Sequence, residues 1–172
     1  MPDSIENALD AAIRSLDAVV VPAVDENHPL ATEQAMLISK TLKLVRGQLP
    51  YRSTRASQEL LRHIAMGQAV LPLVEWSAVL TERLSDSVSG ARGAIESSPA
   101  DQVILEEWTR TLSGLLCAAV RAARRGDVVE RVEIESTVLR LSEPLLVDHM
   151  SWFKAQGWSA SDEIPELAVR FA

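Results

Sequence analysis

The chain has 172 residues, of which 47% are apolar and 24% charged, and its net charge is −7. This balance is typical of one ordinary globular domain and excludes a disordered chain, while seven glycines and seven aromatic residues count against an all-β sandwich or barrel. A net negative charge repels polyanions, so we expect no nucleic-acid partner.

The N-terminal segment has a clear helical pattern. Asp3 and Glu6 have the spacing of a capping box, and the apolar residues that follow fall on one face of a helix. That face comprises Ile5, Leu9, Ala12, Ile13, Leu16, Val19 and Val20. Pro22 predicts the end of this helix, and residues 25–29 predict a turn that places Pro29 at the first position of the next helix.

In the helix that begins at Pro29 we expect an inner apolar stripe and an outer basic side. The stripe comprises Leu30, Leu37, Ile38, Thr41, Val45 and Leu49, and the basic side comprises Lys40, Lys43 and Arg46. Residues 1–39 carry a net charge of −6 and residues 40–63 a net charge of +5. We therefore expect neighbouring acidic helices to balance this basic region, with an anion or partner site as the alternative.

Proline, glycine and capping signals divide the middle of the chain. A third helix is predicted from about Thr54 to Pro72, and a fourth follows, although its Ser- and Gly-rich end allows a loop from about Ser89. Residues 98–101 form a strong start signal for the next helix, which we expect to stop at residues 124–126.

The last long segment, from Val128 to about Gln156, has two apolar stripes on opposite sides. One stripe comprises Val128, Val132, Leu139, Leu146, Met150 and Phe153. The other comprises Ile134, Val138, Leu141, Leu145 and Trp152. A helix that is apolar on both sides is covered on both sides. Either this helix lies in the middle of the domain, or its second stripe is a self-association interface.

These elements predict an all-α fold: an up-and-down bundle of five to seven helices in a single domain spanning residues 1–172, with residues 158–172 as a docked tail. The longest apolar runs fall short of the ~20 residues of a membrane span, so we expect no membrane partner. One cysteine and an acidic N-terminus favour a cytoplasmic location. With no Glu-x-x-His pair we expect no metal, and nothing indicates a cofactor.

Glu135 interrupts an apolar stripe, and burying its charge alone would be costly. Arg121 and Arg124 are the nearest cations, on the helix that we expect to pack antiparallel to it. The three residues predict either an ion pair between helices or the polar end of a small-molecule pocket.

Residues 63–67, His-Ile-Ala-Met-Gly, resemble the histidine phosphotransfer motif. In that family a helical histidine is followed four residues later by a glycine that makes room for a response regulator. The resemblance implies His63 as the phosphorylated residue. Met66 stands where the family has a lysine near the phosphate.

Residues 20–25, Val-Val-Pro-Ala-Val-Asp, followed by His-Pro-Leu-Ala at 28–31, resemble the openings of small all-α bacterial proteins. The resemblance covers about the first 50 residues. It implies a helical fold, no particular activity, and an acyl or aromatic acid as the class of ligand for any pocket.

Three functional hypotheses follow. The first is a non-catalytic helical protein that acts by self-association, as a homodimer, or as an accessory subunit. The second is a small-molecule binding module with an apolar pocket between helices that takes an acyl or aromatic acid. The third is a histidine phosphotransfer-like protein. No catalytic motif is recognisable, which favours a non-catalytic protein and leaves, as a further alternative, an enzyme whose site a single sequence does not disclose.

Overall fold

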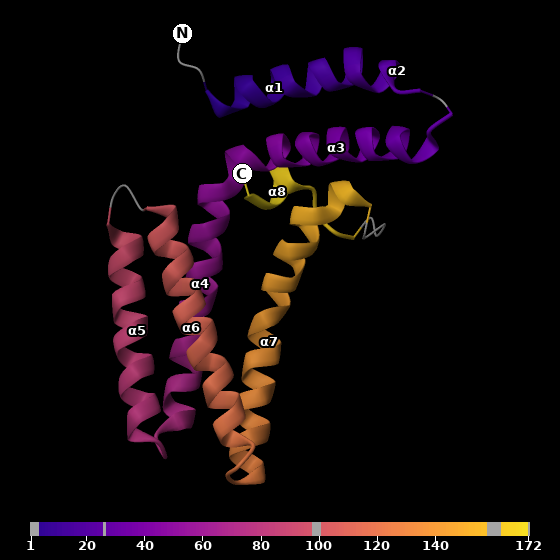
Figure 1. Ribbon diagram of the computed structural model, residues 1–172. Coiled ribbons are helices and arrows are strands. Elements are labelled where there is room, and N and C mark those ends of the chain that lie inside the picture. The colour runs from indigo at the N-terminus through magenta and orange to yellow at the C-terminus, as the bar shows by residue number, and fades with distance from the viewer. Residues whose placement is uncertain (1–3, 26, 98–100, 158–162, 172) are drawn as a thin grey trace. The chain divides into compact units, whose positions relative to one another are not determined.

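The computed structural model describes residues 4–25, 27–97, 101–157 and 163–171 (Figure 1). Across these residues every regular element is helical and none is a strand. The elements are α1 (Ile5–Ser15), a π-helical turn (Leu16–Val20), α2 (Val21–Ala23), α3 (Pro29–Gln48), a 3₁₀ turn (Leu49–Tyr51), α4 (Arg52–Val70), a 3₁₀ turn (Leu71–Val74), α5 (Ala78–Glu96), α6 (Gln102–Ala123), α7 (Val128–Phe153), a 3₁₀ turn (Lys154–Gln156) and α8 (Leu167–Phe171).

Six helices in the described residues have eleven residues or more, which confirms the prediction of an all-α fold with five to seven helices. The chain divides into two compact units. The first contains the described residues up to Arg52 together with Met150–Arg170, and the second contains Ser53–His149 and Phe171. The single domain of residues 1–172 stays a prediction.

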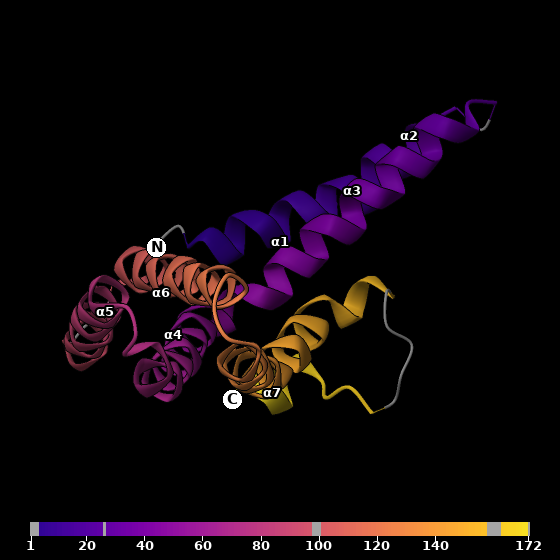
Figure 2. The ribbon, with the colours of Figure 1, turned by 90° about the horizontal axis from the view of Figure 1, so that it is seen from below.

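The second unit consists of α4, α5, α6 and most of α7, which lie side by side with successive helices antiparallel (Figure 1). Figure 2 shows these four helices end on. They enclose an apolar core to which all four contribute. Its fully or almost fully buried members include Leu60, Val70, Val74, Leu84, Ala91, Leu105, Leu112, Ala119, Ala123 and Ile134.

Local signals fix most ends of the helices in this unit. α4 stops at Val70 and gives way to a 3₁₀ turn that contains Pro72, because proline supplies no backbone donor. The Oδ1 atoms of Asp101 and Asp127 accept hydrogen bonds from the amides of Val103, at 2.9 Å, and Val129, at 2.6 Å, and so cap α6 and α7. The start predicted at Ser98–Ala100 lies outside the described residues.

α5 continues through the Ser- and Gly-rich stretch to Glu96, so no loop begins at Ser89. Packing explains this result. Ala91 is fully buried, and Gly90 allows the indole ring of Trp108 on α6 to lie directly against the backbone of α5. A stretch that looks like a loop in sequence is therefore a point of close approach between two helices.

In the first unit, α1 and α3 form an antiparallel helical hairpin in which the two helices lie side by side (Figures 1 and 2). The N-cap of α1 is Ser4, whose Oγ accepts from the amide of Asn7; the predicted cap at Asp3 lies outside the described residues. The helical run ends at Ala23, one residue after Pro22, and α3 begins at Pro29 as predicted.

In the C-terminal region, Lys154 Nζ donates to the carbonyl oxygen of Ile164 and forms an ion pair with Glu166, both at 2.7 Å. The short helix α8 begins two residues after Pro165. The caps considered at Ser161 and Asp162 lie outside the described residues.

Candidate functional site

The two apolar stripes of α7 have different environments. Ile134 is fully buried, and Val138, Leu141 and Leu145 pack against the core of the second unit. Trp152, in the first unit, is also buried. The stripe predicted as a self-association interface is thus largely covered by the chain itself. The exposed apolar side chains of α7 include four members of the opposite stripe, Val128, Val132, Leu139 and Leu146, together with Val129.

Arg124 and Glu135 form the ion pair between helices that their positions in sequence predict. Arg124 Nε lies 2.9 Å from Glu135 Oε1, and this contact joins α6 to α7 near their short connection. The Arg124 side chain is 66% exposed and that of Glu135 31%. Arg121 is exposed on α6. None of the three lines either of the two hollows described below.

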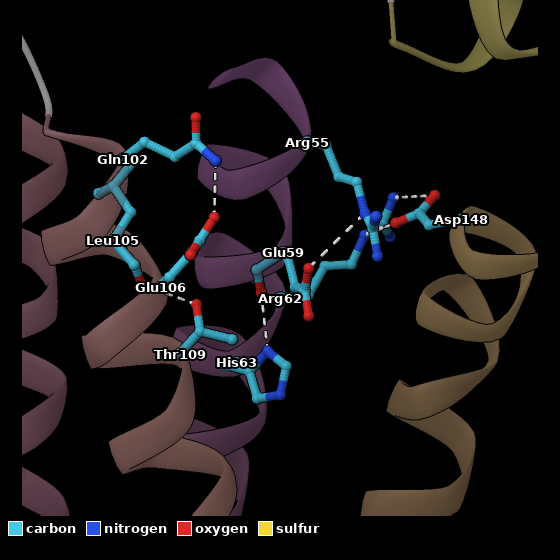
Figure 3. Close-up of polar contacts among 9 residues, drawn as sticks. All are labelled: Arg55, Glu59, Arg62, His63, Gln102, Leu105, Glu106, Thr109 and Asp148. Atoms are coloured by element: carbon cyan, nitrogen blue, oxygen red, sulfur yellow. Dashed lines mark hydrogen bonds and ion pairs between the residues drawn. The ribbon is translucent and has the colours of Figure 1, made fainter. Parts of the chain in front are cut away.

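His63 is buried in α4, with 8% of its surface exposed. Its Nδ1 lies 2.8 Å from the carbonyl oxygen of Glu59 (Figure 3). Since a carbonyl oxygen only accepts, Nδ1 is the protonated nitrogen. A Cβ on Gly67 would lie 2.8 Å from Cγ2 of Val88, so this glycine makes room for α5 of the same chain. His63 and Gly67 therefore have packing roles, and the ring exposes little surface to a protein partner.

The seam between α1 and α3 is polar. Asp17 forms an ion pair with Lys43 at 2.7 Å and accepts a hydrogen bond from Ser39 Oγ. Asp10 accepts from Arg46 Nε at 3.0 Å. For Lys43 and Arg46, these contacts confirm that acidic residues of a neighbouring helical segment balance the basic region. The hydrogen bonds from Lys43 and Ser39 favour the charged carboxylate and hold the pKa of Asp17 below its usual range.

This polar seam reverses the predicted orientation of α3. The residues buried on α3 are Ala35 and Ser39, so the small side chains face α1. The predicted inner stripe points away from α1: Leu30, Leu37, Ile38 and Val45 are 69%, 53%, 52% and 40% exposed. The prediction of an inner stripe here was wrong, because ion-paired and small side chains of α3, and not the predicted stripe, face the other arm of the hairpin.

We call the outward face of α3 the α3 stripe. It comprises Leu30, Gln34, Leu37, Ile38, Thr41 and Val45, all of them exposed. The hydroxyl of Thr41 donates to the carbonyl oxygen of Leu37 at 2.9 Å, which satisfies its polar group within the helix. Gln34 is therefore the one polar member of the stripe that can bond to a partner molecule. The rest of this face is predominantly apolar, and it extends over about 22 Å at ~1.5 Å per residue.

Beside the α3 stripe lies a hollow of about 510 Å³. It is lined by Pro29, Thr32, Glu33, Met36, Leu37 and Lys40. Glu33 and Lys40 are exposed at this flank, and neither forms an ion pair among the described residues. One flank of the stripe thus carries a carboxylate and an ammonium group separated by two helical turns.

A second hollow, of about 320 Å³, lies between α4 and α7 in the second unit. Arg55 and Glu59 line it from α4, and Leu145, Leu146, Asp148 and His149 line it from α7. Arg55 Nε lies 3.8 Å from Glu59 Oε2, which is a loose ion pair with both side chains partly exposed. This hollow combines apolar walls with a guanidinium group, as the binding of a small organic acid requires.

Asp148, which lines this hollow, forms an ion pair with Arg62 of α4. Arg62 Nε lies 2.8 Å from Asp148 Oδ2, and Nη2 donates to Oδ1 at 3.4 Å. Figure 3 shows Arg55 and Arg62 extending from α4 toward Asp148 on α7. The Asp148 side chain is only 7% exposed, so the pair anchors α7 to α4. The sequence analysis did not predict this hollow, because the residues that line it from α4 and from α7 lie far apart in the chain. The available signal was Asp148, a charged residue directly after the apolar residues 145–147.

Among the described residues, no three His, Cys, Asp or Glu side chains are grouped so that they could hold a metal ion. In the same part of the chain no helix is both long enough and apolar enough to cross a membrane. Comparison of the chain with family models, with curated proteins and with solved structures finds no match.

Proposed function

We propose that this protein functions by self-association and that the α3 stripe is its contact surface. The observation that carries the proposal is the orientation of α3: its apolar side chains, between 40% and 69% exposed, point away from its helical partner in the hairpin. Burial of apolar surface contributes about 25 cal/mol per Å², so a second copy that covers this stripe gains stability that the isolated chain lacks.

The α3 stripe suits this role better than the exposed stripe of α7. On α7, Glu135 lies between Val132 and Leu139 and holds its ion pair with Arg124 there. An apolar partner would have to desolvate that pair, which costs free energy. On α3, the polar side chains between Leu30 and Val45 on the same face are uncharged.

Sedimentation velocity across the micromolar range tests the proposal. We expect the wild-type chain to associate as its concentration rises. Ile38→Glu places a charge at the centre of the α3 stripe and should reduce association at least tenfold, since an unpaired charge in an apolar contact is costly. Met36→Glu is the matched control: Met36 is 48% exposed, close to the 52% of Ile38, but lies outside the stripe.

A wild-type chain that remains monomeric throughout this range would overturn the proposal. Equal loss of association in both variants would also contradict it, because the effect would then come from added charge rather than from the α3 stripe. Circular dichroism of each variant shows that the helices are retained.

A second candidate function is the binding of a small acyl or aromatic acid between α4 and α7. The specific observation is the hollow of about 320 Å³, in which Arg55 lies 3.8 Å from Glu59 in a loose ion pair and leucines form the walls. We propose that a ligand carboxylate pairs with Arg55 while its apolar part contacts Leu145 and Leu146.

Thermal shift measurements with hexanoate, octanoate and benzoate test this second candidate. A ligand at 100 times its dissociation constant stabilises the folded chain by about 2.7 kcal/mol. We expect Arg55→Gln to abolish the shift and Arg110→Gln, at an exposed position of α6, to leave it unchanged. If none of the three acids stabilises the wild-type chain, or if the Arg55 variant responds equally, the hollow does not bind this class of ligand.

A further inference from the structure

The α3 stripe is symmetric about its own midpoint. Counting outward from the point between Leu37 and Ile38, Gln34 lies as far on one side as Thr41 on the other, and Leu30 as far as Val45. All six side chains share one exposed face. When two identical helices pair antiparallel about a two-fold axis at this midpoint, every apolar member meets an apolar member, and the two uncharged polar members meet each other.

We infer that α3 of one copy pairs antiparallel with α3 of a second copy, with the two-fold axis between Leu37 and Ile38. This inference rests on the self-association proposed above. In this register Leu30 lies level with Val45 of the second copy along the helix axis, and this happens twice. Next to the two-fold axis, Ile38 of one copy lies beside Ile38 of the other, and Leu37 beside Leu37. A parallel pair in register would instead place each residue level with itself.

The charges beside the stripe favour the same arrangement. Glu33 and Lys40 lie on one flank, on opposite sides of the midpoint. The two-fold axis keeps this flank on the same side of the pair. It brings Glu33 of one copy to within about 3 Å along the helix axis of Lys40 of the other, at ~1.5 Å per residue. In a parallel two-fold pair, by contrast, this flank of one copy would lie on the opposite side of the pair from the same flank of the other copy, so Glu33 and Lys40 would not meet. Glu33 and Lys40 therefore favour the antiparallel direction.

Disulfide cross-linking tests the register. Cys117 is exposed, so all variants are made with Cys117→Ser. Ile38→Cys lies next to the axis and should form a disulfide between two copies under glutathione oxidation. Leu30→Cys alone should not, because the two thiols would lie about 22 Å apart along the pair, whereas a disulfide requires Cα atoms within about 7 Å. Mixing Leu30→Cys with Val45→Cys should give the mixed disulfide.

Exchanging the charges of Glu33 and Lys40 is a second test of the antiparallel register. Glu33→Lys and Lys40→Glu should each weaken association several-fold. Each substitution places like charges next to each other twice, once on either side of the two-fold axis. The double variant should restore the wild-type association constant.

The outcomes separate the two proposals. If the chain is monomeric, self-association itself fails. If it associates but Leu30→Cys cross-links with itself, or the double charge variant is no better than the single ones, self-association stands and the antiparallel register is overturned. If the Ile38→Cys variant is monomeric and its introduced thiol is protected from a thiol reagent, the same chain covers the stripe and both proposals fail.

Discussion

At the scale of single residues, Gly90 on α5 packs very closely against the indole of Trp108 on α6. A Cβ on Gly90 would lie 2.7 Å from Cζ2 of that ring, a distance that real Cβ atoms essentially never reach. At Gly93, three residues later on the same helix, no neighbouring side chain or other helix among the described residues comes within 4 Å of the corresponding position. The packing of α5 therefore requires a glycine at position 90, whereas position 93 has room for a larger side chain.

Alanine substitution distinguishes them. We expect Gly90→Ala to lower the free energy of unfolding by about 1–3 kcal/mol, because the indole must move. Gly93→Ala should raise it by about 0.5–1 kcal/mol, since alanine loses less conformational entropy in a helix. Urea unfolding followed by circular dichroism measures both. Equal effects of the two substitutions would mean that Trp108 does not pack on α5 as described.

The two ion pairs that attach α7 to its neighbours differ in burial. The Asp148 side chain is 7% exposed, whereas in the other pair Glu135 is 31% and Arg124 66% exposed. We expect Asp148→Asn to lower the free energy of unfolding by about 1–3 kcal/mol, because Arg62 loses a charged acceptor in an enclosed position. Glu135→Gln should change it by less than about 1 kcal/mol. A larger loss in the Glu135 variant, measured by the same urea titration, would contradict this order.

At the scale of helices, the ends were largely predictable from sequence, and their orientations were not. Pro29, Pro72 and Asp101 act on the backbone within one turn, so their effect is local and can be predicted from neighbouring residues. Which face of α3 turns inward depends on α1. Asp10 and Asp17 pair with Arg46 and Lys43, so the polar side of α3 faces α1, against the preference of the apolar stripe.

In the candidate site, too, contacts between residues close in sequence were predictable, and contacts across the bundle were not. The pairing of Arg124 with Glu135 was predictable, since a short connection brings these positions together. The hollow between α4 and α7 was not, because Arg55 and Asp148 line it from two helices that lie far apart in the chain. For α7, periodicity predicted two apolar stripes, but only the packing of the second unit decided that the one containing Ile134 is buried.

The polar seam of the hairpin predicts a pH dependence. Lys43 and Ser39 lower the pKa of Asp17 in the folded chain, so the carboxylate binds its proton more weakly there than in the unfolded chain. Its stabilising contribution is therefore fully present above the ordinary aspartate range and is lost as the pH falls through the lowered folded value.

Asp17→Asn removes this titration. We expect the wild-type chain to have a higher Tm than the variant at neutral pH, and the difference to vanish in acid below the folded pKa of Asp17. Thermal unfolding followed by circular dichroism at a series of pH values provides the comparison. A difference that persists unchanged at the acid end would show that the Asp17 charge does not stabilise the hairpin.

At the scale of the whole molecule, the two units differ in how their helices are stabilised. The second unit has an extended apolar core to which four helices contribute. In the hairpin, α1 has no buried residue and α3 has two, Ala35 and Ser39. Few buried apolar contacts imply a low free energy of local opening, so the hairpin should exchange its backbone amides faster than the second unit.

Association should then affect the two units differently. A second copy on the α3 stripe stabilises the closed hairpin by mass action, so protection of the α3 amides should increase with protein concentration. The α5 amides, in a unit that has its own core, should exchange at a rate independent of concentration. Hydrogen exchange measured by mass spectrometry at several concentrations gives both rates from one sample. Ile38→Glu should remove the concentration dependence of α3 and leave α5 unchanged. If wild-type α3 exchanges equally fast over a range in which sedimentation detects association, the contact surface lies elsewhere on the chain, since only a helix covered by the second copy gains protection from it.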